Sequence, residues 1–340
     1  MRIAVVGATG AVGRLLLETL ERRGVAADEV VPFGSERSAG SPLGGWGEVQ
    51  PLSEETIAGF DLALMSAGGS VSREWAPKLA AAGALVIDNS SAWRMDPEVP
   101  LVVSEVNPEA LDSVPKGIVA NPNCTTMIVM LPMKALDGLF GLEAMVATSY
   151  QAAGGAGRHG IDELAAQVPV LSEKTEMLIT DGAGAARLVE HEVHANTLAF
   201  NVVPMLGTMG GNGYTDEEMK LQDESRKILG LPGLQVSPTC VRVPVMVGHA
   251  VAVRASFGRE VDLGAAMEAL ADFPNLVVEE APTPLEWAGR DETVVGRVRA
   301  DLDDPRSLNC FVVGDNLLKG AALNTVQIAE LAIERGLAGR

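Results

Sequence analysis

The chain has 340 residues, of which 47% are hydrophobic and 21% charged, and its formal net charge is −19. This length suggests about two domains, because a single hydrophobic core stops growing efficiently beyond ~250 residues. The surplus of carboxylates disfavours binding to nucleic acid or to an anionic membrane, since phosphate groups require a basic surface. No stretch offers the ~20 uninterrupted apolar residues needed to span a bilayer.

The N-terminus and the cysteines indicate a cytoplasmic protein. The first ten residues, MRIAVVGATG, contain one arginine and a short apolar run that leads directly into glycines. A secretory signal would have a longer apolar stretch and a small-residue cleavage site. The three cysteines, Cys124, Cys240 and Cys310, are odd in number and far apart, which argues against a disulfide framework.

Strand-like and helix-like segments alternate in the first third of the chain. Met1–Val6 is short, apolar and β-branched, as a buried parallel strand should be, and the leucines after it recur at helical spacing. A further helix is predicted over 71–82. Further strands are predicted at 30–33, 62–65, 84–87, 101–103 and 118–119. This alternation predicts an α/β domain with a mostly parallel, Rossmann-like sheet, to which we assign residues 1–123.

Strands become longer and more numerous after Cys124, which predicts an α+β second domain over 124–315. Helices are predicted at 127–139, from about 157, and at 216–229. Strands are predicted at 145–150, 235–247, 250–257, 293–298 and 310–313. The last helix, from about 316 to 336, is amphipathic, and we expect residues 316–340 to pack on the first domain.

The first predicted turn has the features of a pyrophosphate site. Its glycines, Gly7, Gly10 and Gly13, depart from the common G-x-G-x-x-G spacing. They nevertheless lie between a strand and a helix, where backbone N–H groups and the positive helix end can face a pyrophosphate. The alternative is that the glycines serve only a tight turn. The cofactor contacts predicted in this turn are Gly7, Thr9, Gly10, Ala11 and Val12.

The residues after the second predicted strand favour NADP over NAD. Arg37 and Ser38 are suited to a 2′-phosphate, whereas an NAD site usually has an acidic residue there for the ribose hydroxyl. Glu36 beside them weakens this inference. The loop that contains Ser66 and Gly68 follows a later strand and is expected to line the same crevice.

Cys124 is the candidate nucleophile. It lies between an apolar strand and a helix, and the positive end of a helix favours the thiolate. The alternative is a small buried side chain, which is the reading we adopt for Cys240 and Cys310. His249 is the best candidate for proton transfer near neutral pH, and Arg242 in the same segment offers a planar fork for a carboxylate.

Two histidines could instead indicate a metal site. His191 and His194 have Glu190 and Glu192 beside them. The cluster lacks further ligands at suitable spacing, so a solvated or interface surface is the preferred interpretation and no metal is predicted.

Eight segments together carry a family resemblance. In chain order they are GATGAVG, SERSAG, IDNSSAWRMDPEVPLVVSEVN, NPNCTT, SYQA, NGYTDEEMK, TCVRVPVMVGHA and DNLLKGAALNTVQIAE. In their order and spacing the chain resembles the aspartate-semialdehyde dehydrogenase family along nearly its whole length. The resemblance implies a glyceraldehyde-3-phosphate-dehydrogenase-like fold, with a Rossmann-like domain followed by an α+β catalytic and dimerisation domain, and a homodimer.

The resemblance also implies roles for individual residues. Cys124 resembles the nucleophile that forms an acyl-enzyme, His249 the acid/base, and Gln151 in SYQA the residue that orients the substrate. Arg242 resembles the partner of the substrate α-carboxylate. Glu217 resembles the partner of its amino group.

A second group of residues resembles the family's phosphate site. Arg94 and Lys220 match the phosphate-binding pair, assisted by Asn123. Without the resemblance, Arg94, Lys220 and Glu217 would be interpreted as ordinary surface charges.

The remaining matches concern the nicotinamide end of the cofactor. Asn316 resembles a late contact to that end, and Gly154 and Gly155 would offer backbone N–H groups to the cofactor or substrate. The family often has serine where this chain has Gly154, so one hydroxyl is missing.

The resemblance implies a reversible, NADPH-dependent reductive dephosphorylation of L-4-aspartyl phosphate to L-aspartate 4-semialdehyde, with inorganic phosphate as the third small molecule. This reaction belongs to lysine, threonine, methionine and diaminopimelate biosynthesis. One alternative is a related reductase for N-acetylglutamyl phosphate or a malonyl thioester, although Arg242 and Glu217 favour a free amino acid. Another is a non-catalytic cofactor-binding or assembly protein.

Overall fold

The computed structural model describes residues 1–339, which form two compact units. Unit 1 comprises residues 1–130, 224–232 and 317–339, and unit 2 comprises residues 131–223 and 233–316. The residues of two helices, α3 (Cys124–Phe140) and α7 (Asp216–Leu229), are divided between the units.

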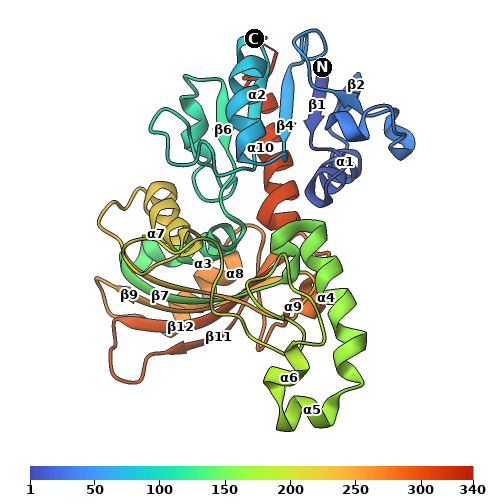
Figure 1. The fold of residues 1–340 in the computed structure, drawn as a ribbon. Helices are drawn as coiled ribbons and strands as arrows, with labels where there is room; N and C mark the ends of the chain where they lie inside the picture. The colour runs from blue at the N-terminus through green and yellow to red at the C-terminus, as the bar shows by residue number, and fades with distance from the viewer. Residues whose placement is uncertain (340) are drawn as a thin grey trace. The chain divides into compact units, whose positions relative to one another are not determined.

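Unit 1 is built on a six-stranded parallel sheet in the order β3-β2-β1-β4-β5-β6 (Figure 1). Its strands are β1 (Arg2–Val6), β2 (Glu29–Gly34), β3 (Gln50–Pro51), β4 (Leu62–Met65), β5 (Leu85–Asp88) and β6 (Ile118–Ala120). The predicted Rossmann-like sheet is therefore confirmed. The strand order reverses between β1 and β4, and nucleotides bind beyond the carboxyl ends of parallel strands at such a point.

Helices cover this sheet. They are α1 (Ala11–Arg23), α2 (Gly69–Ala81) and α10 (Leu323–Glu334), with the short turns η1 (Glu36–Ser38), η2 (Gly44–Trp46), η3 (Pro108–Asp112) and the π-helical η5 (Leu318–Ala322). α1 packs against α10, and α2 packs against β4, β5 and β6. Leu16 and Leu20 of α1 share one apolar core with Val326 of α10 and with Ile3 and Val5 of β1.

Unit 2 contains a mixed six-stranded sheet in the order β10-β11-β12-β9-β7-β8, which confirms the predicted α+β architecture. Its strands are β7 (Leu142–Gln151), β8 (Gln235–Arg242), β9 (His249–Phe257), β10 (Leu276–Val278), β11 (Thr293–Ala300) and β12 (Ser307–Gly314). β7 and β8 are parallel, as are β10 and β11, whereas β11, β12, β9 and β7 pair antiparallel in that sequence. Its remaining helical segments are η4 (Ala153–Ala156), α4 (Gly157–Ser172), α5 (Thr175–Thr180), α6 (Gly182–Ala186), α8 (Leu263–Asp272) and α9 (Pro284–Trp287).

The prediction of a strand over 101–103 is wrong. Leu101 makes only an isolated bridge with Ala120. The N–H of Val103 is bonded to the side chain of Asn107 at 2.9 Å, so a local side chain takes the donor that a sheet ladder would use.

Other predicted boundaries also shift. The strand predicted over 235–247 ends at Arg242, because the following segment contains Pro244 and a turn at Gly248, whose φ is +97°. The last helix, predicted from about 316, begins as a π-helical turn and becomes α-helical only at Leu323.

Candidate active site

The turn between β1 and α1 requires glycine at two positions. Gly7 has φ +84°, and a Cβ there would overlap the carbonyl oxygen of Ser66. A Cβ at Gly13 would overlap the carbonyl oxygen of Gly7, because α1 starts immediately against the turn. Because both residues lack a Cβ, the backbone of the turn and the first turn of the helix can lie close together, as a pyrophosphate site requires.

The start of α1 lacks side-chain capping. Its N-cap is Gly10, no side chain bonds to the first N–H groups, and its first turn contains no acidic residue. Thr9, Ala11 and Val12 lie in the same turn. Backbone N–H groups at a helix start favour an anion, so this arrangement is suited to a phosphate group.

The other predicted cofactor residues of unit 1 follow the neighbouring strands. Arg37 and Ser38 form part of η1 after β2, where Arg37 is exposed and the Ser38 hydroxyl donates to the carbonyl oxygen of Ser35 at 2.9 Å. Ser66 and Gly68 follow β4, and the N–H of Ser66 donates to the carbonyl oxygen of Val6 at 2.8 Å. Because β2, β1 and β4 are adjacent and parallel, these loops lie along one edge of the sheet.

Cys124 is the first residue of α3 and is half-buried. The predicted start at Met127 was too late, so the cysteine belongs to the first turn itself. The side-chain oxygen of Asn123 accepts the N–H groups of Thr125 at 2.9 Å and Thr126 at 3.2 Å, which is N-capping geometry. The sulfur is thereby attached to a well-defined helix start, whose positive end favours the thiolate.

Arg94 is buried, with 8% of its surface exposed, and is therefore not a surface charge. Its Nε donates to the carbonyl oxygen of Asn121 at 2.9 Å, and its Nη2 donates to the carbonyl oxygen of Asn89 at 2.7 Å. Its Nη1 forms an ion pair with Glu224 at 3.0 Å. Within unit 1, the guanidinium consequently lies beside the segment that leads into Cys124.

Two residues of α7 in this region were not predicted from the sequence. Glu224 is 1% exposed, and its second carboxylate oxygen accepts the N–H of Asn123 at 2.6 Å. Lys227 donates from Nζ to the carbonyl oxygens of residues 94, 96 and 99, at 2.8, 2.7 and 2.8 Å. Helical periodicity was the signal that could have found them, because Glu217, Lys220, Glu224 and Lys227 recur along one face of the helix.

In unit 2, three predicted site residues lie at one edge of the sheet. Gln151 ends β7 and Arg242 ends β8, and the two are direct partners in the parallel register. His249 begins β9, which runs antiparallel to β7, so its first residue comes to the same edge.

Hydrogen bonds connect these residues with α7 and with Ala152. Arg242 donates from Nη1 to the carbonyl oxygen of Ala152 at 2.7 Å. Gln151 donates from Nε2 to Glu217 at 3.4 Å, and Glu217 forms an ion pair with Lys220 at 3.0 Å. Unit 2 thus brings together five of the predicted residues: Gln151, Glu217, Lys220, Arg242 and His249.

The protonation states of His249 and Lys220 follow from their burial and from the charges of neighbouring side chains. Burial, and secondly the Arg242 guanidinium, hold the pKa of His249 well below its usual range, so the imidazole is neutral. Burial also opposes the charged form of Lys220, but Glu217 and Asp216 outweigh it and raise the pKa of Lys220. The lysine therefore stays cationic.

Steric limits in the folded chain explain why η4 contains glycines, which the sequence did not reveal. A Cβ at Gly155 would lie 2.6 Å from Nη1 of Arg242 and 3.2 Å from Cε1 of His249. A Cβ at Gly154 would lie 2.8 Å from the carbonyl oxygen of Met246. The missing serine hydroxyl at Gly154 thus coincides with a close backbone approach. The expected offer of N–H groups by Gly154 and Gly155 is wrong, because these groups donate to the carbonyl oxygens of Met246 at 2.9 Å and Ala152 at 3.0 Å.

Asn316 lies after β12 and is buried. Its side-chain oxygen accepts the N–H of Gly248 at 2.9 Å, whereas its Nδ2 has no hydrogen-bond acceptor among the described residues. A buried amide N–H₂ without an acceptor is costly, so this group is suited to donate to a ligand oxygen.

The other cysteines are buried, as predicted: Cys240 and Cys310. Burial raises the pKa of the Cys310 thiol to about 12, so it is a poor nucleophile.

His194 is buried rather than solvated, which corrects the surface interpretation. Its Nε2 lies 3.1 Å from the carbonyl oxygen of Gly160, whereas His191 is exposed. Within residues 1–339, no group of three His, Cys, Asp or Glu side chains is arranged to hold a metal ion.

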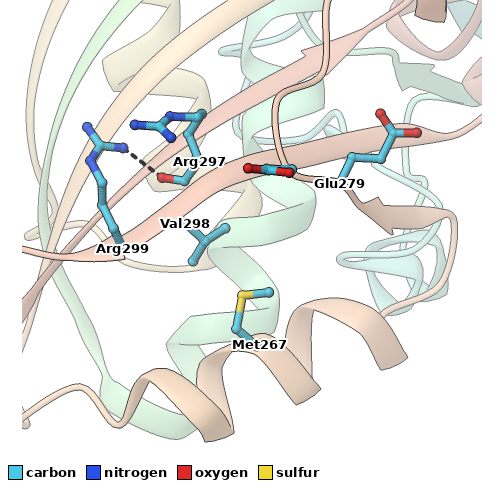
Figure 2. Close-up of a pocket in the computed structure, with 6 residues that line it drawn as sticks. Met267, Glu279, Arg297, Val298 and Arg299 are labelled. Atoms are coloured by element: carbon cyan, nitrogen blue, oxygen red, sulfur yellow. Dashed lines mark hydrogen bonds between the residues drawn. The ribbon is translucent and has the colours of Figure 1, made fainter.

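A surface pocket of unit 2 lies among β11, α8 and the segment after β10 (Figure 2). Its lining residues are Met267, Glu279, Glu280, Arg297, Val298 and Arg299. Arg299 donates to the carbonyl oxygen of Arg297 at 2.6 Å, as the dashed line in Figure 2 shows. None of the lining residues is a predicted site residue, and the lining contains both acidic and basic side chains. The pocket therefore gives no support for a catalytic or cofactor site.

No helix in the described chain has the length and apolar character needed to cross a membrane.

Comparison with known proteins supports the family resemblance. The family model described as the NAD binding domain of semialdehyde dehydrogenase matches residues 2–114, and the one described as its dimerisation domain matches residues 133–319. An aspartate-semialdehyde dehydrogenase of Streptomyces akiyoshiensis is 49% identical, over 97% of this chain and 98% of that protein. An aspartate-semialdehyde dehydrogenase of Corynebacterium glutamicum is 48% identical, over 98% of this chain and 99% of that protein.

A solved structure leads to the same conclusion. Aspartate semialdehyde dehydrogenase II of Vibrio cholerae, complexed with ASA, has a TM-score of 0.90 at 40% identity and covers 98% of both chains. Full-length identity of this size, two matching domain models and the observed fold agree. The chain belongs to the aspartate-semialdehyde dehydrogenase family.

Proposed function

We propose that this chain catalyses the reversible, NADPH-dependent reductive dephosphorylation of L-4-aspartyl phosphate to L-aspartate 4-semialdehyde. The observation that carries the proposal is the position of Cys124 in the first turn of α3, in the same unit as a buried arginine that lies beside the turn. A thiolate next to an anion-binding group is what the exchange of an acyl phosphate for an acyl thioester requires. The names of the relatives support the same substrate.

The residues of unit 1 fit a nicotinamide dinucleotide. The glycine turn and the open start of α1 would hold the pyrophosphate, with Ser66 and Gly68 in the adjacent loop. Arg37 and Ser38 would bind a 2′-phosphate, which is the basis for proposing NADP rather than NAD. When bound, the dinucleotide accepts or supplies the hydride.

Asn316, Gly154 and Gly155 are the candidates for the nicotinamide end. The buried Nδ2 of Asn316 would donate to the carboxamide oxygen, because it lacks an acceptor among the described residues. Gly154 and Gly155 would contact the cofactor through their backbone without donating to it, because their N–H groups are bonded to the carbonyl oxygens of Met246 and Ala152.

In the oxidative direction, the Cys124 thiolate adds to the aldehyde carbon and forms a C–S bond, which places a negative charge on the former carbonyl oxygen. His249 accepts the N–H of Ala152 at Nδ1, so its own proton is on Nε2 and would form a hydrogen bond to that oxygen, which stabilises the negative charge. Gln151 would orient the same group. Transfer of hydride from this alkoxide to the bound dinucleotide would leave the thioester, so the proton stays on Nε2 and none has to be removed from the oxygen.

Phosphate then attacks the thioester and releases aspartyl phosphate and the Cys124 thiolate. Arg94 and Lys220 would hold its charges, assisted by Asn123, while Arg242 binds the substrate α-carboxylate and Glu217 its amino group. The biosynthetic direction is the reverse of these steps. Both cations are needed, because an otherwise acidic protein would repel anionic substrates.

We assign cofactor binding to residues 1–123 and 316–340, and catalysis and dimerisation to residues 124–315. The matched dimerisation-domain model supports a homodimer. We propose that the enzyme acts in the cytoplasm.

The test is phosphate-dependent reduction of NADP⁺ in the presence of aspartate semialdehyde, repeated with NAD⁺. We expect activity with phosphate, little without it, and none in Cys124→Ala. Retained turnover in that variant would show that another residue is the nucleophile. Parallel assays with N-acetylglutamate semialdehyde and malonate semialdehyde test the related reductases, and a preference for either would overturn the substrate assignment.

A further inference from the structure

We propose that Glu224 is a positioning residue for the phosphate step: its buried carboxylate fixes both the Arg94 guanidinium and the backbone before Cys124. This inference rests on the proposed function, since it assigns a purpose to the arrangement around Arg94. All the contacts on which it depends lie within unit 1.

The two oxygens of Glu224 serve different partners. Oε1 accepts from Nη1 of Arg94 at 3.0 Å, and Oε2 accepts from the N–H of Asn123 at 2.6 Å. One carboxylate thus connects the candidate anion-binding group with the residue whose side chain caps α3. Both partners donate, so both bonds require an acceptor, and a carboxylate offers two equivalent oxygens.

The bonds of Arg94 determine which of its N–H groups remain for a ligand. A guanidinium has five N–H groups. Arg94 uses one on Nε for Asn121, one on Nη1 for Glu224 and one on Nη2 for Asn89. One N–H on each terminal nitrogen remains, which is the number needed to hold two oxygens of a phosphate.

Lys227 supports the same arrangement from the backbone side. Its ammonium bonds to three carbonyl oxygens of the segment 94–99, so this segment is fixed to α7 at both the backbone and the side chain of Arg94. Glu224 and Lys227 lie one turn apart on α7. The helix therefore fixes the orientation of the guanidinium before any ligand arrives, which lowers the cost of binding.

Glutamine at this position would be a poor substitute. Its amide has one oxygen and one N–H₂ group, and the latter would face either Arg94 or the N–H of Asn123, where two donors meet. Glu224→Gln is therefore expected to release one of the two partners. Glu224→Asp keeps the charge but shortens the side chain, so it should act in the same direction more weakly.

The experiment compares Glu224→Gln and Glu224→Asp with the wild-type enzyme and with Glu330→Gln. Glu330 forms a two-bond pair with Arg23 in the same unit, at 2.7 Å for each bond, so the control makes the same chemical change in another arginine–glutamate pair. The measurements are the KM values for phosphate and NADP⁺, together with kcat normalised to the number of alkylatable Cys124 thiols. A second readout is the protection of Cys124 from iodoacetamide by inorganic phosphate.

We expect Glu224→Gln to raise the KM for phosphate by about tenfold or more, the effect of losing one charge-assisted hydrogen bond, and to weaken phosphate protection in parallel. The KM for NADP⁺ should stay within about twofold, and Glu330→Gln should resemble the wild type. A merely structural role would lower the number of active sites without changing the phosphate KM of those that remain, and that result would overturn the proposal. If Glu224→Gln does not fold, Glu224→Asp decides by the same criteria.

The two proposals fail differently. If the wild type shows no phosphate-dependent reduction of NADP⁺, the proposed function is wrong. Phosphate protection of Cys124 that is present in the wild type and weakened in Glu224→Gln would still support the positioning role.

Discussion

His249 accepts the backbone N–H of Ala152 at its Nδ1, at a distance of 3.0 Å. An N–H group that points at Nδ1 requires a lone pair there, so the proton of the neutral ring must be on Nε2. In the proposed mechanism, the imidazole would therefore act on the substrate as a hydrogen-bond donor. General-base action from Nε2 would require the other tautomer and the loss of the bond to Ala152.

This tautomer can be measured in the free protein. We expect the ¹⁵N NMR shifts of His249 to show a protonated Nε2 and an unprotonated Nδ1, unchanged as the pH falls through about 6.5, the usual pKa of histidine. Arg242→Met should raise the pKa only in part, because burial is the larger cause. A His249 that titrates normally would contradict the assignment.

The lowered pKa of His249 also makes the stability of the protein depend on pH. Because the pKa of His249 is lower in the folded state, the unfolded state binds more protons between the folded-state pKa and about 6.5. The free energy of unfolding should therefore fall as the pH drops below about 6.5 and should be insensitive to this group above it. His194 contributes with the same sign, since burial lowers its pKa. Urea unfolding at pH 7.5 and at lower pH, with His249→Gln as the comparison, should show a smaller loss in the variant.

Gly155→Ala should damage substrate binding more than cofactor binding. The new methyl group would lie 2.6 Å from the Arg242 guanidinium and must displace it or the turn of η4. We expect the KM for aspartate semialdehyde to rise by at least about tenfold, since Arg242 would lose a charge-assisted bond. The control is Gly138→Ala in α3, where a Cβ has open space and alanine favours the helix. An unchanged KM would show that Arg242 does not bind the substrate from this position.

Arg37→Gln tests the proposed 2′-phosphate contact. Losing one charge-assisted hydrogen bond corresponds to about 1.5–3 kcal/mol, so the KM for NADP⁺ should rise by about 10- to 100-fold. The KM for NAD⁺ should change little, because it lacks the 2′-phosphate. Arg259→Gln, at another exposed arginine, serves as the charge-matched control. Equal losses for both cofactors would argue against the contact.

Lys319 is fully buried and forms an ion pair with Glu105 at 2.6 Å. Its ammonium also donates to Gln327 at 2.7 Å. Lys319→Met leaves a buried carboxylate without its cation and should lower the free energy of unfolding by about 3–5 kcal/mol. The double variant Lys319→Met/Glu105→Gln should recover part of this loss in urea unfolding. A single variant as stable as the wild type would show that the pair is not structurally important.

Sequence alone was sufficient where the determining interactions are local. The strand, glycine turn and helix around Gly7 follow from apolar periodicity and from steric limits on a few adjacent residues. A helix after Cys124 was predicted from the sequence, but its first residue was placed three positions late, because the capping role of Asn123 was not predicted. The strand predicted over 101–103 failed because Asn107 takes the N–H of Val103, a choice that apolar composition does not reveal.

Tertiary structure decided the contacts that join distant segments. Glu224 meets Arg94, 130 residues away in the chain, and Lys227 bonds to the same segment. Gly155 is required because strands β8 and β9 bring Arg242 and His249 against it. The sequence specified which residues have the chemistry, since side-chain type and local spacing are written in it. The orientation of each group, its protonation state and its partner depend on burial and on the pairing of remote elements, which exist only in the folded chain.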